Sequence, residues 1–600
     1  MRRVPLARAA QVLAVVLVAA YGALLRLDAL VEKYGTVDHP RVASFLTHTA
    51  APLGERLRPY DTGWPRDPNP YVGGDPINYL RYAREMEHFY QAHVREPVFL
   101  ALTRACLWLV ADQDVGLSFA SAAGSVLAII GTYLLAAALV PRWAALAASV
   151  LVAVEYELVT WSVDGWRDDT FMAAALFAAW AFLRVRRAPS ATNALILGLC
   201  AGAACLTRIT SLSFVVPGLL VLALDEGPPP RRDRLRATAI AAAMTVLVVA
   251  PYLISCAIST GDPLIAINYH TVYYRHGEGM PTDQAMSAAD YIAAKFVDRP
   301  VATFDTGFLG IFVEPFTTKW RGLPPALHAL RTPLVWSAAA GLLLLAFTPG
   351  GRLLLAVLFA SLLPYAWTWN IGGGNAWRFT MHAYPIYIVA ACYAITRVGV
   401  IAKALWAARH ALPPRPSRTA ISWAAAASAF AVVVLPAVYL FMPWLVVREA
   451  VRLGEDVNIE TGPRDRLFYR EGWSAPHDDG VVVRVSQAER ARVQIPLPER
   501  IPYELALRVD PVVPDVQQRL AVLFNGQFVA RFDLTWNPER VGSYRLRVRP
   551  DQVRAGRNEL TLIPDALVTA GSAGRRFSWL PAQERIGVRL WYVRVLPNPE

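Results

Sequence analysis

The sequence predicts a polytopic α-helical membrane protein with about 11 transmembrane helices, followed by an extracytoplasmic all-β jelly-roll or sandwich domain. Hydrophobic residues make up 55% of its 600 residues and charged residues 18%, whereas about 25% charged is usual in soluble domains. The apolar residues gather in runs of about 20, the length that spans a bilayer as a helix. After about residue 460, short runs of alternating apolar and polar residues replace them.

The apolar runs give the expected spans in chain order. They lie at about 9–27, 112–140, 142–161, 168–186, 192–209, 211–225, 236–257, 332–348, 351–369, 383–399 and 420–444. The apolar segment 97–111 is short, so we expect it to lie at the membrane interface before the second span. The first run is too long for the apolar region of a signal peptide, which predicts an uncleaved first span.

Basic residues predict the orientation. Six basic links fall on one side of the membrane if the N-terminus is cytoplasmic, as the positive-inside rule requires. They are "MRR", "PR" at 141–142, "RVRRAPS", "PPPRRDRLR", "PGGR" and "KALWAARHALPPRPSR". This orientation places segments 28–111, 259–331, 370–382 and 445–600 outside. The chain then divides into a membrane domain, residues 1–450, and a β-domain, residues 451–600.

The tail has the pattern of an all-β sandwich. Runs such as "GVVVRVS", "YELALRV" and "GVRLWYVRVL" alternate in polarity and are separated by Pro, Asn and Gly. "FNGQF" predicts a hairpin with an Asn-Gly turn. Trp473, Trp536, Trp579 and Trp591 suit a sugar-stacking platform, but core packing is the favoured interpretation for a sandwich.

Composition argues against several other classes of protein. The net charge of +12 does not indicate nucleic-acid binding, because the Arg clusters lie in the short links between spans. All five cysteines fall in apolar segments without metal-ligand spacing, so we expect small buried side chains. "GGGN" at 372–375 follows a span instead of opening a phosphate-binding loop, and no P-loop motif is present.

Charged residues close to the spans gather on the predicted outer side. An Asp or Arg at the centre of a span costs about 2.5–3.5 kcal/mol, so each such residue needs a reason. The candidates are Asp75, Arg95, Glu96, Asp164, Arg167, Asp168, Asp169, Arg208, Arg378 and His382. We expect these side chains to meet in one pocket that faces away from the cytosol.

Such a set suits sugar transfer from a lipid-linked donor to a hydroxyl group. A carboxylate can take the acceptor proton as general base, and guanidinium groups can hold the phosphate that leaves with the lipid. We assign catalysis to Asp75, Glu96 and Asp168, and substrate binding to the other seven candidates. We assign no metal ligands, and a divalent metal is left as a possibility.

The order of these motifs resembles the GT-C glycosyltransferases, polytopic enzymes that use polyprenyl-phosphate sugars and include the protein mannosyltransferases and the lipid A aminoarabinose transferases. The resemblance covers about residues 9–225, with "LLRL", an outer-loop Asp before an amphipathic helix, "REPVFLAL", "SVDGWRDDTF" and "GLCAGAACLTRITSLSFVVPGLL". It returns at "WRFTMHAYP". The tail, with "FYREGWSAPHDDGVVVRV" and "LFNGQF", resembles carbohydrate-binding jelly-roll modules.

The resemblance implies roles for individual residues. Asp75 matches the first-loop base, Glu96 the acid of a Pro-containing motif, and Arg167–Asp169 the turn after the third span. Pro76 stands where many members carry a second acid, and in this respect the chain looks partly like the oligosaccharyltransferases. The implied enzyme moves a hexosyl or pentosyl group, with inversion, from a polyprenyl-phosphate donor to a glycan, lipid or protein acceptor. The Arg- and Ala-rich composition favours a bacterium, hence the lipid bilayer of its inner membrane.

Each of these residues also has a purely structural interpretation. Asp75 before Pro76 is also a common start of a helix, and Glu96 could simply pair with Arg95. The 164–169 turn could be a neutralised span boundary, Arg208 could have no role in the site, Arg378 could snorkel and His382 could be structural. For His270 and His276 in "NYHTVYYRHGEG", a solvated loop is favoured over a metal site.

Other functions also stay open at this point. An oligosaccharyltransferase with a diphosphate donor would use a divalent metal held by Asp75 and the Asp168–Asp169 turn. A transporter would need charges through the cytoplasmic half of the bilayer as well. A non-catalytic scaffold would need only the sugar-binding tail.

Overall fold

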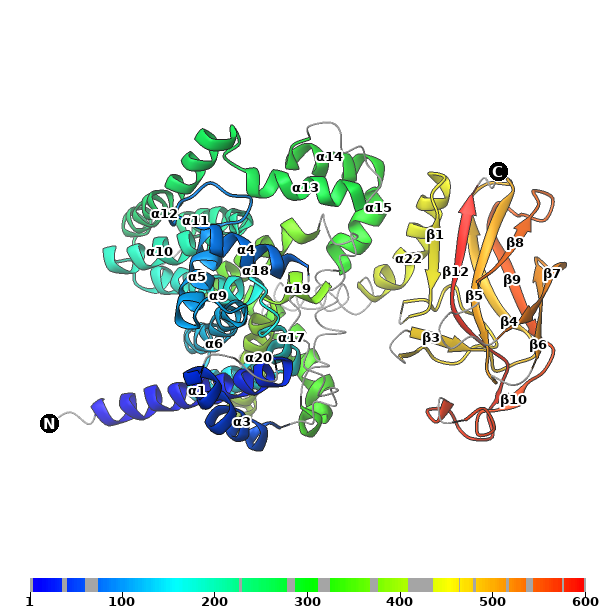
Figure 1. Cartoon of the computed structure of the whole chain (residues 1–600), viewed down its shortest axis with the longest axis horizontal. Coiled ribbons are helices and arrows are strands. Elements are labelled where there is room, and N and C mark those ends of the chain that lie inside the picture. Colours follow the sequence, from blue (N-terminus) through cyan, green and yellow to red (C-terminus); the bar gives the residue numbers. More distant parts are fainter. Residues whose placement is uncertain are drawn as a thin grey trace. The chain divides into compact units, whose positions relative to one another are not determined.

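The structure is a computed structural model that forms two compact units (Figure 1). It describes residues 4–34, 40–59, 74–225, 229–277, 286–310, 324–366, 376–407, 435–462, 464–478, 482–513, 517–535, 543–574 and 577–597. One unit comprises Met1–Lys295 and Thr306–Pro413, and the other comprises Phe296–Asp305 and Pro414–Glu600. The first unit is helical, and the second contains the β-strands; each is described by itself.

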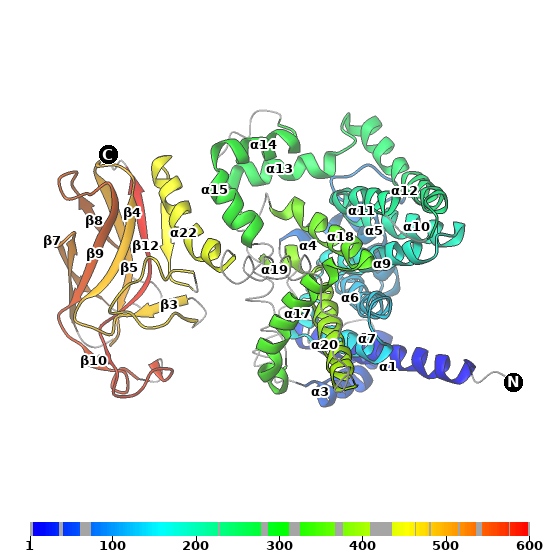
Figure 2. The same ribbon diagram turned by 180° about the vertical axis from the view of Figure 1, so that it is seen from behind.

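The helical unit is built from helices that follow one another closely along the chain (Figure 2). Its N-terminal part holds α1 (Val4–Tyr34), α2 (Pro40–Phe45), η1 (Leu46–Ala50), α3 (Ala51–Leu57), α4 (Asp75–Glu85), α5 (Pro97–Leu109), α6 (Val115–Ala137), α7 (Arg142–Val154), α8 (Tyr156–Trp161) and α9 (Asp168–Arg187). Its later part holds α10 (Ala191–Thr207), η2 (Ile209–Ser211), α11 (Leu212–Leu224), α12 (Arg231–Thr260), α13 (Ile265–Gly277), α14 (Ala288–Asp298), η5 (Pro325–Leu330), α17 (Arg331–Ala346), α18 (Pro349–Ala366), α19 (Ala376–Thr380) and α20 (Tyr384–Ala407).

Several helices are long and apolar enough to cross a membrane. Among the described residues there are five, at Ala9–Lys33, Val115–Ala137, Arg231–Thr260, Ala326–Ala346 and Pro349–Ala366. Shorter apolar helices accompany them, including the segment expected at the interface, which forms α5. The helical unit is therefore a multi-pass membrane domain, and the predicted fold class is confirmed.

Two predicted spans differ in detail. The span predicted at 142–161 is broken into α7 and α8, because the Glu155 backbone is extended and its Oε2 accepts a hydrogen bond from the Leu158 amide at 2.7 Å. That bond caps a new helix inside an apolar run. The span predicted at 420–444 lies outside the described residues up to Leu435, where α22 (Leu435–Arg452) begins.

The core of the helical unit packs α6, α7, α9 and α10 through small and branched side chains. Ile129, Leu176 and Leu197 have no exposed surface. Gly124 of α6 lies so close to α9 that an added Cβ would be 2.7 Å from the backbone nitrogen of Thr170, so only glycine fits there. This contact fixes the first turn of α9, which carries two of the predicted site residues.

The second unit contains two antiparallel sheets. The strands are β1 (Val457–Glu460), β2 (His477–Asp478), β3 (Val482–Val485), β4 (Ala491–Leu497), β5 (Tyr503–Pro511), β6 (Gln518–Phe524), β7 (Gln527–Leu534), β8 (Ser543–Val548), β9 (Gly556–Pro564), β10 (Val568–Thr569), β11 (Arg585–Ile586) and β12 (Val588–Pro597). One sheet has the order β2-β3-β12-β5-β8, with β1 also on β12, and the other has the order β4-β9-β6-β7. Short helices α15 (Pro300–Ala302) and η3 (Thr303–Gly310) precede α22 in the chain.

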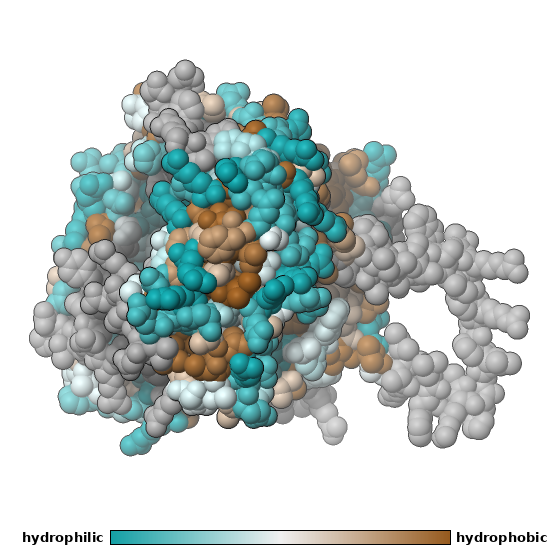
Figure 3. All heavy atoms as spheres, turned by 90° about the vertical axis from the view of Figure 1, so that its right-hand side faces the viewer, coloured by the Kyte–Doolittle hydropathy of each residue, from teal (hydrophilic) through white to brown (hydrophobic). Residues whose placement is uncertain are grey.

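Alternating side chains of both sheets form one core. Val493, Leu505, Leu520, Leu560 and Val593 are fully buried, as the period-two pattern of the tail predicts. The face drawn in Figure 3 is largely hydrophilic, with apolar side chains gathered in patches near its middle. The alternation is therefore that of strands with one face buried and the other toward water.

The Asn-Gly hairpin is confirmed. Asn525 and Gly526 join β6 to β7 with φ angles of 49° and 84°, the left-handed conformation that such a turn requires. Among the tail tryptophans, Trp473 donates from Nε1 to the carbonyl oxygen of Arg492 at 3.0 Å, and Trp579 stacks on a histidine ring at 4.1 Å. These two rings are engaged within the protein, whereas Trp536 lies outside the described residues.

Candidate active site

A cavity of about 900 Å³ lies in the helical unit. Its wall is formed by α4, the residues before α5, the turn before α9, the residues after α10, helices α13 and α14, the end of α18, and α19. Its arginines and carboxylates come from the other elements, whereas α13 and α14 contribute apolar and aromatic residues together with Thr271, His270 and His276. Distant parts of the chain therefore converge here, as the sequence predicted.

Asp75 faces this cavity from the first position of α4. The capping position belongs to Gly74, whose φ of 68° suits glycine, so Asp75 is the first residue of the helix and not its cap. Instead, Oδ1 accepts from Nη2 of Arg95 at 3.0 Å, and Oδ2 lies 3.7 Å from Nη2 of Arg378. Asp75 therefore does more than start a helix, because its carboxylate is directed at two arginine side chains.

Glu96 holds two distant segments together. It sits at the N-cap of α5, yet its Oε1 accepts from the backbone amide of Ile209 at 2.7 Å, and Oε2 is paired with Arg167. It is buried, with 4% of its surface exposed. Both oxygens are thus engaged by protein groups, and its ionic partner is Arg167 instead of the neighbouring Arg95. This geometry suits a residue that positions the site.

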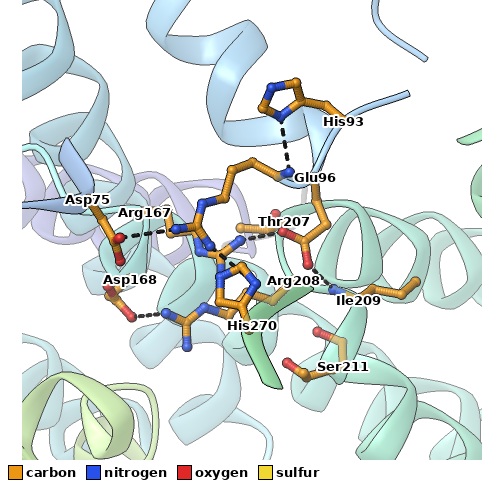
Figure 4. Close-up of polar contacts among 12 residues, drawn as sticks. Asp75, His93, Glu96, Arg167, Asp168, Thr207, Arg208, Ile209, Ser211 and His270 are labelled. Atoms are coloured by element: carbon orange, nitrogen blue, oxygen red, sulfur yellow. Dashed lines mark hydrogen bonds and ion pairs between the residues drawn. The ribbon is translucent and has the colours of Figure 1, made fainter. Parts of the chain in front are cut away.

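Asp168 opens α9 and joins two arginines from other helices. Its Oδ1 accepts from Nη2 of Arg208 at 2.5 Å, and its Oδ2 lies 3.8 Å from Nε of Arg378. Arg208 follows α10 and donates from Nη1 to the Tyr365 hydroxyl at 2.8 Å. Figure 4 shows Asp75, Asp168 and Arg208 pointing toward one another. Arg378 therefore lies between Asp75, which lines the cavity, and Asp168, which is not a lining residue but pairs with Arg208.

Aromatic rings hold the arginine side chains in place. The Arg378 guanidinium lies 4.2 Å from the centroid of Trp166, and that of Arg208 lies 5.3 Å from Phe171 and 5.4 Å from Tyr365. Stacking of this kind favours a cation and restricts its rotation. Sequence reasoning did not assign the aromatic residues to the site, although "GWRDD" already places Trp166 beside the charged turn.

Three of the predicted substrate-binding residues are not on the cavity wall. Asp164 pairs with Lys33 at 2.6 Å, and Asp169 is buried with Oδ2 accepting from a serine hydroxyl of α6 at 3.1 Å. His382 is buried behind the site, where Nε2 lies 2.9 Å from the Ser361 hydroxyl and the ring packs on an aromatic of α9. These positions suit roles in packing and not direct contact with a substrate.

His270 was missed by the sequence reasoning. The solvated loop favoured for this histidine is wrong, because residues 265–277 form helix α13 and His270 lines the cavity. Burial, together with the positive charge of Arg95, lowers the pKa of His270 well below its ordinary value. The signal was available, since Ala266, His270 and Tyr274 follow the four-residue spacing of one helix face, and all three line the cavity.

The donor set does not fit a divalent cation. Asp75 and Asp168 share the guanidinium of Arg378, which lies where a bridging cation would lie, and Asp169 points elsewhere. Among the described residues no group of three His, Cys, Asp or Glu side chains is placed to hold a metal. The metal alternative, with Asp75 and the Asp168–Asp169 turn as ligands, is therefore not supported by their positions.

The arrangement suits an anion instead. Among the described residues five guanidinium groups line the cavity, and three carboxylates either line it or pair with these groups, which leaves two positive charges. The guanidinium groups are those of Arg81, Arg95, Arg167, Arg208 and Arg378, and the carboxylates are those of Asp75 and Glu96 on the wall and of Asp168, which pairs with Arg208. Guanidinium groups bind phosphate oxygens through paired hydrogen bonds. A cavity with surplus positive charge and an aspartate at its edge can hold a phosphate beside a base.

A comparison with protein families agrees with this picture. Residues 94–254 match the model of the family described as dolichyl-phosphate-mannose-protein mannosyltransferase, a segment that includes Glu96, Asp168 and Arg208. A search of curated proteins found no match. The family match, together with the helical fold and the separate β-rich unit, confirms the resemblance to the GT-C glycosyltransferases.

Solved structures with similar folds were also found. One is the archaeal oligosaccharyltransferase AglB from Archaeoglobus fulgidus in complex with an inhibitory peptide and a dolichol-phosphate, at 15% identity and a TM-score of 0.40, covering 71% of this chain. The match spans only 55% of the length of that enzyme. Another is ArnT from Cupriavidus metallidurans bound to undecaprenyl phosphate, at 11% identity and a TM-score of 0.40, covering 73% of this chain and 70% of that one. A third is the C-terminal CBM6 of LamC from Zobellia galactanivorans, at 13% identity and a TM-score of 0.16, covering 24% of this chain and 99% of that one.

Proposed function

We propose that this chain is a membrane glycosyltransferase that moves a sugar from a polyprenyl-phosphate donor to an acceptor hydroxyl on the extracytoplasmic side. The observation that carries the proposal is the single cavity in which surplus guanidinium charge lies beside the Asp75 carboxylate. The family matched by residues 94–254 is described by a dolichyl-phosphate-linked sugar donor, which is the same donor chemistry.

Asp75 is the general base in this proposal. Its carboxylate takes the proton of the acceptor hydroxyl, whose oxygen attacks the anomeric carbon of the donor sugar. The new bond between that carbon and the acceptor oxygen forms while the bond from the same carbon to the phosphate oxygen breaks. The configuration is inverted, and the polyprenyl phosphate leaves with the bonding electrons and one added negative charge.

Arg208 and Arg378 receive that charge. Arg208 is fixed by its two hydrogen bonds, to Asp168 at 2.5 Å and to Tyr365 at 2.8 Å. Arg378 is held less tightly, because its contacts to the two aspartates, at 3.7 and 3.8 Å, exceed hydrogen-bond length. Its N–H groups are therefore available to phosphate oxygens. Preorganised cations of this kind stabilise the charge that develops on the leaving group.

The aromatic and apolar wall supplies the rest of the binding site. Tyr82, Tyr269, Tyr274 and Tyr291 line the cavity, and their rings suit contacts with a sugar or an isoprenoid chain. Holding donor and acceptor in one cavity makes the reaction effectively unimolecular. The acceptor is a glycan, lipid or protein hydroxyl.

The basic links between spans support a cytoplasmic N-terminus, which places the cavity and the β-rich unit outside the cytosol. The composition supports the inner membrane of a bacterium. An oligosaccharyltransferase that uses a metal and a diphosphate donor receives less support, because Asp169 does not reach the cavity.

Replacement of Asp75 by Asn tests the proposal. We expect the turnover of sugar transfer from the polyprenyl-phosphate pool of host membranes to fall about 10²- to 10⁴-fold, the usual contribution of a general base. Asp112→Asn is the matched control, since that side chain is exposed and pairs with Arg84 outside the cavity. Mass spectrometry of surface glycans in cells complemented with each variant reports the same loss. Full turnover by the correctly inserted Asp75→Asn variant would end the assignment of the base.

A further inference from the structure

His270 is a titratable side chain in the cavity that the proposed reaction does not yet use. Its Nδ1 lies 3.5 Å from Nη1 of Arg95, while its Nε2 is buried and has no hydrogen-bond partner among the described residues. A buried polar atom without a partner is unfavourable, so such an atom in a binding cavity points to a missing ligand atom.

The contact with Arg95 determines which ring nitrogen carries the proton. A guanidinium group can only donate hydrogen bonds, so we assign Nδ1 of His270 as the acceptor of this contact and the ring proton to Nε2. The opposite tautomer would direct an N–H group of the ring at an N–H group of Arg95. The lowered pKa of His270, caused by burial and then by Arg95, Arg167 and Arg208, agrees with a neutral ring. Nε2–H is therefore a hydrogen-bond donor without an acceptor.

The helix that carries His270 is itself fixed. At its start, Oδ1 of Asp262 accepts from the Leu264 amide at 2.8 Å, and Oδ2 accepts from Nδ2 of Asn268 at 2.9 Å. These bonds anchor the first turn of α13, so the histidine is presented on a regular helix. A group held in this way can bind a ligand with little loss of conformational entropy.

We propose that His270 donates a hydrogen bond from Nε2 to a phosphate oxygen of the polyprenyl-phosphate donor, which makes it a substrate-binding residue; this inference rests on the proposed function. A phosphate oxygen is the favoured acceptor because Arg95 contacts the ring and Arg167 and Arg208 line the same cavity, and an anion is the species that such surroundings attract. Arg95 then connects the two ends of the site, since it contacts His270 through Nη1 and Asp75 through Nη2.

Two substitutions separate the two nitrogen atoms. The amide nitrogen of Gln in His270→Gln reaches the position of Nε2 and keeps a donor there, whereas the shorter side chain of His270→Asn reaches only the position of Nδ1 beside Arg95. The probe is undecaprenyl phosphate, titrated into the full-length protein in lipid nanodiscs and followed by tryptophan fluorescence. We expect His270→Asn to weaken binding about 10- to 100-fold and His270→Gln to stay within about 3-fold of the unsubstituted protein. His328→Asn, at an exposed position of η5, is the control for handling.

The outcomes of this titration test the role of Nε2 of His270 separately from the proposed function. The opposite order, with Asn normal and Gln impaired, would show that His270 acts only by holding Arg95 and would overturn the inference. Equal binding by both variants, whether normal or weak, would also overturn it. If the unsubstituted protein does not bind undecaprenyl phosphate at all, the proposed function fails with it. Normal binding by the unsubstituted protein and by both variants contradicts the role of His270 alone.

Discussion

Each unit of this protein buries an ion pair between an arginine and an aspartate, but the two pairs differ in how many of their polar atoms are hydrogen-bonded. In the β-rich unit, Arg484 and Asp465 form a two-point pair: Nε of Arg484 donates to Oδ2 at 2.6 Å, Nη2 donates to Oδ1, and Nη1 donates to the carbonyl oxygen of Ser474. At the cavity, Arg208 and Asp168 meet through one hydrogen bond, and in the part of the chain that the structure describes neither Nε of Arg208 nor Oδ2 of Asp168 has a hydrogen-bond partner. We call the first pair closed, because protein groups satisfy its donors and acceptors, and the second pair open, because one donor and one acceptor have no partner among the described residues.

The difference teaches how to recognise a buried ion pair that serves binding. A pair that contributes to the fold satisfies its donors and acceptors internally, because an unpaired buried polar atom is costly. Other arginines of the cavity wall also carry buried atoms without a hydrogen-bond partner among the described residues, including Nε of Arg95 and of Arg167. An anionic ligand with several oxygens would satisfy groups that the protein leaves incomplete. Single atoms of this kind also occur elsewhere, as at Nε of Arg508 in the β-rich unit, so their gathering around one cavity distinguishes the site.

Asp465→Asn tests the closed pair and has the largest expected effect on stability. Removing the carboxylate leaves the buried Arg484 without its ionic partner, which costs about 3–5 kcal/mol. Hydrogen exchange of the amides of β3 and β12 in the full-length protein measures this loss as lower protection. Asp533→Asn is the matched control, since its pair with Arg519 is exposed and contributes less than about 1 kcal/mol. Unchanged protection in the Asp465→Asn variant would contradict the closed-pair interpretation.

Arg208→Lys tests the open pair and has a smaller expected effect. Lysine keeps the charge but cannot make both hydrogen bonds of Arg208 or stack between Phe171 and Tyr365. We expect kcat/KM for sugar transfer to fall about 10- to 100-fold, the equivalent of one or two lost hydrogen bonds. Transfer assays at varied donor concentration measure it, and thermal unfolding checks the fold. Normal kinetics would remove Arg208 from phosphate binding.

The sequence was sufficient to predict the multi-pass helical unit, the β-rich unit and the gathering of charged residues around one cavity, because apolar periodicity and short charged motifs are local signals. The partners within the site were not predictable in the same way. Glu96 binds Arg167 and the amide of Ile209, which are 71 and 113 residues away. Such pairings depend on helix packing that a single sequence does not encode locally. His270 was missed because its helix lies in a polar stretch between spans.

The turn before α9 shows the same limit within a few residues. Asp164 and Asp168 stand close together in "DGWRD", and both were expected in the site. Gly165, with a φ of 78°, reverses the chain between them. Asp164 then turns to Lys33 of α1, while Asp168 starts α9 and meets Arg208. A backbone conformation available mainly to glycine therefore decides which acid pairs with Arg208 of the cavity wall.

Asp164→Asn should have the smallest effect and sharpens this distinction. Its ion pair with Lys33 has a partly exposed carboxylate, with 35% of that side chain accessible, so we expect a stability change below about 1 kcal/mol. Sugar transfer should stay within about 2-fold of the unsubstituted protein, because Asp164 is not on the cavity wall and the substitution therefore leaves the reaction barrier almost unaltered. Asp168→Asn, from the same turn, is the comparison variant, and its transfer should fall together with that of Arg208→Lys. The measurement is the ratio of turnover between the two amide variants in one membrane preparation. A loss in Asp164→Asn as large as in Asp168→Asn would show that Asp164 also takes part in the reaction. The contrast between ion pairs that bind a substrate and ion pairs that only stabilise the fold would then be wrong.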